Sequence, residues 1–291
     1  MRDEILNILP VGLREYLALM DLQSLEEIRL RAMKNVILYF GKKQGEFVTD
    51  YFIDDNQLKE TLEYISKFSL YAYEEDIRQG FITIRGGHRV GVAGKIVKEN
   101  CKIKTISNIS SINIRISREV INCGKDAVGY IKNGHSIHNT LIVSPPGVGK
   151  TTLLRDLLRL VSDEIGLKVS VVDERSEIAS CYKGIPQNNV GLRSDIYDCC
   201  PKVEGIMLMI RAMSPQVVAV DEIGGEEDVD ALMRAKHAGI RLIATMHGEG
   251  IEDIRPVHRI FNRYIFLKND VNRSMEIYDE NLLRIEQGSY D

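Results

Sequence analysis

The sequence contains no tryptophan, few prolines and no long hydrophobic run. The opening residues, Met1-Arg-Asp-Glu, lack the apolar core that follows the basic head of a secretory signal. No later stretch approaches the roughly 20 consecutive apolar residues that a membrane-spanning helix needs. We therefore expect a protein that is neither exported nor integral to a membrane.

The chain has five cysteines, an odd number, and none of them forms a C-x-x-C pair. This spacing argues against a disulfide framework and against a zinc site. Reduced cytosolic thiols are the simpler interpretation. The cysteines are Cys101, Cys123, Cys181, Cys199 and Cys200.

The composition describes a globular protein that is too long for one typical domain. The chain has 291 residues, of which 44% are hydrophobic and 27% charged. No Gly/Ser-rich linker, low-complexity tract or internal repeat marks a boundary, but turn signals at Asn122-Cys-Gly-Lys and Lys132-Asn-Gly-His surround a short apolar helix. We expect one domain over residues 1–125 and a second over residues 126–291.

Charge is distributed unevenly along the chain, whose net charge is -4. Between Arg78 and Arg118 the sequence carries nine Lys or Arg against the single acid Glu99, so this tract is strongly basic and the remainder strongly acidic. Such a tract can face nucleic acid, anionic lipid, the phosphates of a nucleotide or an acidic neighbouring subunit, or it can simply be a solvated face of a sheet.

The N-terminal half predicts a small α/β domain. Apolar residues recur at helical spacing between Ile5 and Met20, and Asp54 with Gln57 forms a capping-box pattern before another helix. A further helix is expected through 71–79, and the glycines of 85–94 indicate bulges or close backbone approach within β structure. Strands are expected over 27–31, 36–40, 81–84, 102–109 and 112–116, with a turn over 41–45.

A phosphate-binding loop dominates the second half. An apolar run from Thr140 precedes a Gly-rich turn, and an amphipathic helix follows it through Val161. Gly147 and Gly149 allow successive backbone N–H groups to surround a polyphosphate, while the next lysine reaches its terminal charges. The pattern G-x-x-x-x-G-K-[ST] is met except at its first position, which is a serine. The predicted nucleotide-binding residues are Ser144, Pro145, Pro146, Gly147, Val148, Gly149, Lys150, Thr151 and Thr152.

Strands and helices alternate after this loop, which predicts a parallel sheet covered on both faces. Ligands of such sheets bind beyond the carboxyl ends of the strands. The strands are expected over 168–172, 216–220 and 241–244, and the helices over 202–213 and 226–238.

Acidic residues follow two of these strands. Asp221 comes after Val-Val-Ala-Val and is expected to hold Mg2+ through water, opposite the hydroxyl of Thr151. Glu222 can polarise an attacking water. Asp173 and Glu174 end a neighbouring strand and compete for the role of base. An acidic pair after a strand is also a common turn signal.

His247 follows the last of these strands, in Thr245-Met-His247. It is a candidate for sensing the γ-phosphate or relaying a proton to the attacking water. A single histidine in such a position is more often part of a turn.

Taken in order, these motifs resemble those of the secretion ATPase superfamily, which includes the motors of type II and type IV secretion and of pilus extension and retraction. Val-Val-Asp-Glu-Arg-Ser-Glu, Val-Val-Ala-Val-Asp-Glu and Ala-Thr-Met-His-Gly correspond to its Asp box, Walker B and His box. Non-catalytic stretches, such as Ser-Leu-Tyr-Ala-Tyr-Glu-Glu-Asp-Ile-Arg-Gln-Gly and Ser-Ile-Asn-Ile-Arg-Ile, resemble the family of stage III sporulation AA proteins. The resemblance extends from about Glu26 to Leu267.

The resemblance implies an N-terminal α/β domain joined to a RecA-like P-loop ATPase domain, with ATP as substrate, Mg2+ as cofactor and six protomers in a ring. It implies that an arginine of the N-terminal domain reaches the γ-phosphate; Arg115 matches best, and Arg89 and Arg118 are alternatives. The implied role is to power a sporulation channel between mother cell and forespore. The motor would dock on membrane subunits from the mother-cell cytosol, as a peripheral protein of the forespore membrane.

Two departures from the pilus motors leave the base open between Glu174 and Glu222. Those motors follow their Walker B glutamate with Arg-Asp, whereas Glu222 is followed by Ile223-Gly-Gly-Glu226, and they generally have glycine where this chain has Asp221. We favour Glu222 as the base.

Two other functions compete with the motor. A nucleic-acid-binding ATPase would use the basic tract, but overall acidity and the lack of an aromatic stacking array count against it. A structural ring component that binds nucleotide with little turnover is the other alternative.

Overall fold

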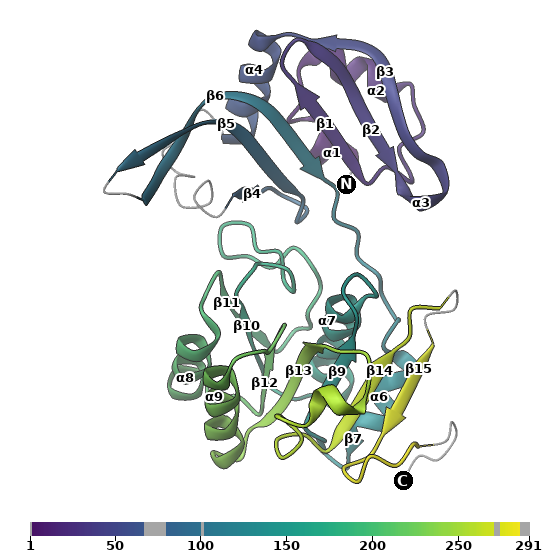
Figure 1. Ribbon diagram of the computed structural model, residues 1–291, viewed down its shortest axis with the longest axis vertical. Coiled ribbons are helices and arrows are strands. Elements are labelled where there is room, and N and C mark those ends of the chain that lie inside the picture. The colour runs from purple at the N-terminus through teal and green to yellow at the C-terminus, as the bar shows by residue number, and fades with distance from the viewer. Residues whose placement is uncertain (1, 67–79, 100–101, 271–273, 286–291) are drawn as a thin grey trace. The chain divides into compact units, whose positions relative to one another are not determined.

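The computed structural model describes residues 2–66, 80–99, 102–270 and 274–285. The chain forms two compact units, Met1–Arg118 and Glu119–Asp291 (Figure 1). The helix expected over 71–79 and Cys101 lie outside the described residues. None of the described helices combines the length and the apolar composition that crossing a bilayer requires.

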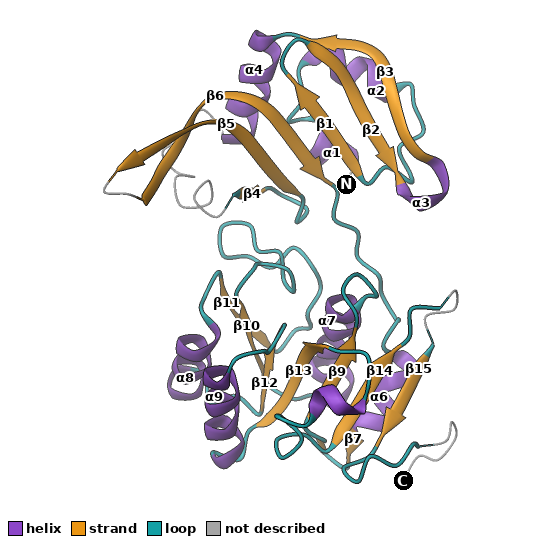
Figure 2. Cartoon of the chain, viewed as in Figure 1, coloured by secondary structure: helices purple, strands orange, loops and turns teal. Residues whose placement is uncertain are grey.

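The first unit is an antiparallel sheet of six strands with helices packed on it (Figure 2). The strand order is β3-β2-β1-β6-β5-β4. Leu13 and Leu17 of one helix and Leu58 and Leu62 of another enter the same buried cluster as Ile28 of the sheet. The helices are α1 (Arg2–Leu6), α2 (Val11–Ala18), α3 (Gly41–Gln44) and α4 (Asp55–Ser66); the strands are β1 (Glu27–Arg31), β2 (Lys34–Phe40), β3 (Gly45–Ile53), β4 (Phe81–Thr83), β5 (Arg89–Glu99) and β6 (Lys102–Arg115).

Local sequence signals explain several of these elements. The capping box before α4 is confirmed, because the carboxylate of Asp54 accepts the N–H of Gln57 at 2.8 Å and the Gln57 side chain accepts the N–H of Asp54 at 3.2 Å. Close backbone approach is confirmed at Gly94, where a Cβ atom would lie 2.6 Å from the carbonyl oxygen of Ser107.

Two expectations for this unit were wrong, and one strand was missed. The two strands expected over 102–109 and 112–116 are one strand, β6, which stays continuous through irregularities in its pairing with β5. The turn expected over 41–45 is the helical turn α3. Strand β3 was missed because it lies at the sheet edge and exposes Phe47, Val48 and Phe52, which obscures the alternation of buried and exposed residues.

The second unit is a seven-stranded sheet covered by helices on both faces, as expected for a doubly covered α/β domain. Its order is β11-β10-β12-β13-β9-β14-β15, and the strands are parallel except for the antiparallel pair β14 and β15. The strands are β9 (Thr140–Ser144), β10 (Val169–Asp173), β11 (Ser194–Asp198), β12 (Val217–Val220), β13 (Arg241–His247), β14 (Arg263–Leu267) and β15 (Met275–Tyr278). A separate two-stranded ribbon consists of β7 (Lys132–Asn133) and β8 (Ser136–Ile137).

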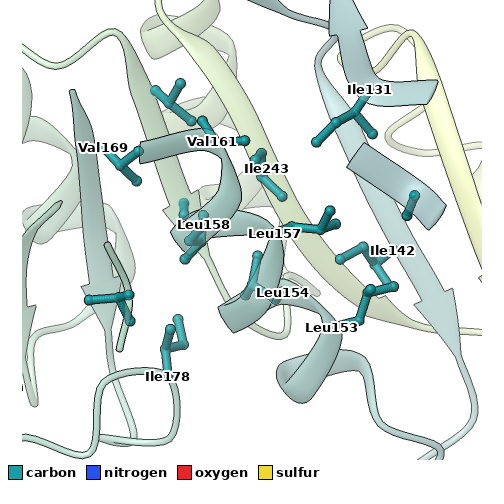
Figure 3. Packing of buried hydrophobic residues seen from close by; sticks show 14 of the residues in the cluster. Ile131, Ile142, Leu153, Leu154, Leu157, Leu158, Val161, Val169, Ile178 and Ile243 are labelled. Atoms are coloured by element: carbon teal, nitrogen blue, oxygen red, sulfur yellow. The ribbon is translucent and has the colours of Figure 1, made fainter. Parts of the chain in front are cut away.

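Alternate residues of the central strands divide between two cores. On one face, helix α7 inserts four leucines, Leu153, Leu154, Leu157 and Leu158, beside Ile142 and Ile243 of the sheet (Figure 3). On the other face, α8 and α9 pack on Leu141, Val218 and Leu242. This burial fixes the strand ends and with them the polar residues that follow. The helices are α6 (Lys125–Ile131), α7 (Lys150–Leu160), α8 (Lys202–Ala212) and α9 (Glu226–His237), with single turns η2 (Val161–Ile165) and η3 (Ile251–Ile254).

Candidate active site

The loop between β9 and α7 is shaped to receive an anion. Gly147 and Gly149 have φ of 74° and 121°, conformations that strain any residue with a Cβ atom. Within the described chain, the backbone N–H groups of residues 147–152 have no hydrogen-bond acceptor. Consecutive free N–H groups at the start of a helix are a phosphate-binding arrangement, because the helix dipole adds to their partial charges.

Lys150 is the first residue of α7, directly after this loop, and is 5% exposed. Its Nζ donates to the carbonyl oxygens of Ser144 at 3.0 Å and Pro145 at 3.2 Å, and it lies 3.0 Å from Nδ1 of His247. Burial lowers the pKa of Lys150, and the nearby carboxylates of Asp221 and Glu222 oppose that effect. A partly desolvated ammonium interacts strongly with an entering anion.

The serine at the first position of the motif is compatible with this loop. Ser144 is 1% exposed, and its hydroxyl donates to the carbonyl of Pro145 at 2.9 Å. It pairs with His247 across β9 and β13, which places the two strand ends side by side. The substitution therefore leaves the loop intact.

The predicted metal ligands lie together. The hydroxyl of Thr151, on α7, donates to one carboxylate oxygen of Asp221 at 2.7 Å. The hydroxyl of Thr245, on β13, donates to the other oxygen. A hydroxyl and a carboxylate converging beside a phosphate loop are the oxygen donors that Mg2+ prefers.

Glu222 has a strained backbone and a doubly engaged side chain. Its φ is 52°, and its N–H donates to the hydroxyl of Thr245 at 2.8 Å. One carboxylate oxygen lies 3.2 Å from Nε2 of His247, and the other lies 2.5 Å from Nη1 of Arg175. Strained conformations of this kind cost about 1–3 kcal/mol and occur preferentially at functional sites.

The structure places the competing acids of the Asp box in different surroundings. Asp173 is 1% exposed, and its carboxylate accepts the N–H groups of Glu177, Ile178 and Ala179 at 2.8, 2.9 and 2.9 Å. Burial raises its pKa to about 6, although these hydrogen bonds oppose the shift. The carboxylate of Glu174 instead forms an ion pair with the ammonium of Lys202 on α8. Asp173 therefore organises its own loop.

Sequence reasoning missed three residues of the site: Arg155, Arg175 and Thr245. Arg155 lies on α7 and donates to the carbonyl oxygens of Ile178 and Glu177, both at 2.7 Å, so it ties the phosphate-loop helix to the Asp box. Arg175 places a guanidinium on Glu222 from another strand end, although no arginine follows Glu222 in sequence. The only sequence signal was the position of these residues inside the motifs.

The predicted arginine Arg115 belongs to the first unit, whereas the other predicted site residues belong to the second. Arg115 is the exposed last residue of β6. Of the alternatives, Arg89 lies over the ring of Phe81 at 4.3 Å, and Arg118 donates to the carbonyl of Leu25 at 2.9 Å.

A phosphate loop at the carboxyl edge of a parallel sheet, with acidic residues at the ends of two neighbouring strands, is typical of a P-loop ATPase fold. Solved structures of this fold are similar to the chain. They include the ATPase DotB from Legionella pneumophila, with a TM-score of 0.61, 13% identity, and coverage of 94% of this chain and 81% of that one. The pilus retraction motor PilT with bound ADP gives a TM-score of 0.62, 15% identity, and coverage of 94% and 82%.

The chain belongs to the family described as sporulation stage III, protein AA, whose model matches residues 1–285. It is 43% identical over 281 residues to stage III sporulation protein AA of Bacillus subtilis strain 168. That alignment covers 91% of this chain and 90% of the relative. The family resemblance found in the sequence is thereby confirmed.

Proposed function

We propose that this chain is a Mg2+-dependent ATPase that acts as a ring-forming motor during endospore formation. The observation that carries the proposal is the convergence of Thr151 and Asp221, 2.7 Å apart, beside a loop of free backbone N–H groups. The fold shared with DotB and PilT, named as an ATPase and a retraction motor, supports the same conclusion.

Each residue of the site has a chemical task in this proposal. The N–H groups of residues 147–152 and the ammonium of Lys150 bind the phosphates of ATP. Thr151 and Asp221 would hold Mg2+, which would supply positive charge beside the phosphates. The carboxylate of Glu222 orients the attacking water and accepts its proton. His247, between Lys150 and Glu222, positions both.

Glu222 is favoured over Glu174 as the base because of what each carboxylate contacts. Glu222 directly follows the metal-binding acid and touches His247, which in turn touches Lys150. Glu174 is paired with Lys202 of α8. Proton acceptance requires a base within hydrogen-bond reach of the water, and only Glu222 neighbours the other reacting groups.

In this proposal six protomers form a ring, and Arg115 reaches the γ-phosphate. The ring docks on membrane subunits of a sporulation channel, at the mother-cell face of the forespore membrane. The basic tract serves the docking. Lys95 and Lys98 are exposed on β5, whereas Lys104 forms an ion pair with Glu99 at 2.9 Å. Charge reversal at Lys95 and Lys98 should therefore weaken docking to a membrane subunit or to anionic vesicles more than charge reversal at Lys104 does, with ATP binding unchanged.

The test is ATP hydrolysis by the purified protein and by Lys150→Ala, with molecular mass followed by light scattering with and without ATP and Mg2+. The proposal predicts turnover that the substitution abolishes and assembly that depends on nucleotide. Tight ATP binding without turnover in every assembly state, also with membrane subunits present, would favour a structural ring component. Steeply salt-dependent binding of single strands would favour a nucleic-acid-binding ATPase.

A further inference from the structure

Arg175 lies on a loop whose backbone is held in place by several hydrogen bonds. The loop follows β10, and the buried carboxylate of Asp173 accepts three of its backbone N–H groups. Arg155 of α7 and the side chain of Asn188 bind the carbonyl of Ile178, at 2.7 and 3.0 Å, from two further directions. The backbone beside Arg175 is therefore fixed relative to the phosphate-loop helix.

The side chain of Arg175, by contrast, is accessible. It is 65% exposed, and its Nη1 lies 2.5 Å from one carboxylate oxygen of Glu222. The other oxygen of Glu222 faces His247 at 3.2 Å. Both oxygens are therefore engaged, and a water that approaches the carboxylate competes with the guanidinium for the lone pairs of one of them.

Arg175 is the partner that can leave at small cost. An ion pair with an exposed arginine is weak, because water solvates the freed guanidinium. A guanidinium also matches the oxygens of a phosphate, which it can bind through two parallel N–H donors. The terminal phosphate of a bound nucleotide would bring more negative charge to the mouth of the site than one carboxylate does.

We infer that Arg175 is a nucleotide-responsive clamp on Glu222: it leaves the carboxylate for the terminal phosphate when ATP binds, and so frees the base only when the substrate is present. This inference rests on the proposed ATPase function and deepens it. No arginine follows Glu222 in the sequence, and the guanidinium that contacts it comes from the neighbouring strand end. Arg175 is thus a positioning residue for Glu222 and a ligand for the third phosphate.

Nucleotide affinity tests the clamp without relying on turnover. We would measure binding of ADP and of a non-hydrolysable ATP analogue, both with Mg2+, to the wild type, Arg175→Ala and Arg175→Lys. Arg255→Ala is the matched control, because Arg255 is 74% exposed and paired with the neighbouring Glu252. The Arg175→Ala substitution should weaken binding of the ATP analogue about tenfold and binding of ADP by less than about twofold. Arg175→Lys should be intermediate, and Arg255→Ala should have no effect.

A double-mutant cycle with Glu222→Gln adds a readout that a purely structural role would not produce. Removing the charge of the carboxylate weakens its hold on Arg175, so Glu222→Gln alone should tighten binding of the ATP analogue severalfold. In the Arg175→Ala background, Glu222→Gln should leave the affinity for the ATP analogue unchanged, because no arginine remains for the carboxylate to hold.

Three results would overturn the clamp while leaving the proposed function intact. Arg175→Ala could weaken binding of both nucleotides equally, or it could weaken binding of neither. The effects of Arg175→Ala and Glu222→Gln on affinity for the ATP analogue could also be additive. A wild type that binds neither nucleotide would instead overturn the proposed function. Failure of the inference and failure of the function are therefore separate outcomes.

Discussion

The hydroxyl of Thr245 donates a hydrogen bond to the carboxylate of Asp221 and accepts the N–H of Glu222 at 2.8 Å. One buried side chain of β13 thus fixes both acidic residues that follow β12. The carbonyl of Thr245 also accepts the N–H of Ile223 at 2.9 Å, which holds the strained turn at Glu222 in place.

Thr245→Val should therefore damage the acidic turn while preserving the shape of the core. The substitution leaves the partly buried N–H of Glu222 without its acceptor, which costs about 1 kcal/mol of unfolding free energy. Urea unfolding measures this loss. Thr245→Ser retains the hydroxyl and should keep the Mg2+ dependence of nucleotide binding, which the valine variant should lose. Equal Mg2+ dependence in both variants would contradict the role given to the hydroxyl.

Asp173 should make stability depend on pH. Its pKa, raised to about 6 by burial, is higher than in an unfolded chain, so the folded state keeps its proton to higher pH. Such a carboxyl stabilises the fold at acid pH, and the contribution is lost as pH rises through the folded pKa. The stability of the wild type relative to Asp173→Asn should fall by about 1 kcal/mol between pH 5 and pH 7.5.

Urea unfolding of both proteins at the two pH values gives this difference, because other titrating groups cancel between them. A difference that stays constant or grows with pH would mean that the three N–H donors outweigh burial and keep Asp173 ionised.

Gly205 should be required for the packing of α8 on the sheet. A Cβ atom at this position would lie 2.4 Å from Cγ1 of Val172, the residue before Asp173. Gly205→Ala must therefore displace α8 or β10, with an overpacking cost of about 1–3 kcal/mol. Gly250→Ala is the control, because its Cβ would have no neighbour within 4 Å and its φ is -155°. Denaturant midpoints that move equally in both variants would refute this packing argument.

Much of the second unit could be predicted from the sequence because its central strands are buried on both faces. Strand β12 is a continuous apolar run, and β10 is apolar except for Ser170 and its last residue, Asp173. The polar residue that ends or follows each run lies at the carboxyl edge of the sheet. Ser194 to Asp198, which form β11, contain no apolar run, since this strand lies at the sheet edge with partly exposed residues. Edge strands of this kind give little sequence signal.

The contacts of the arginines could not be predicted in the same way. Arg155 binds backbone carbonyls, which every residue has, and Arg175 meets Glu222 only because two strand ends are neighbours in the sheet. A strand order that is not the order of the chain brings these residues together. The motifs predict which residues lie at the carboxyl edge of the sheet, and the strand order determines which of these residues are in contact.

The assignment of the catalytic base is decided by steady-state ATP hydrolysis of the wild type, Glu222→Gln and Glu174→Gln, with ATP binding measured on the same samples. We expect Glu222→Gln to bind ATP and not hydrolyse it, and Glu174→Gln to retain at least partial turnover, because Glu174 is occupied by Lys202. Turnover that survives in Glu222→Gln and is lost in Glu174→Gln would transfer the base to the Asp box and contradict the account.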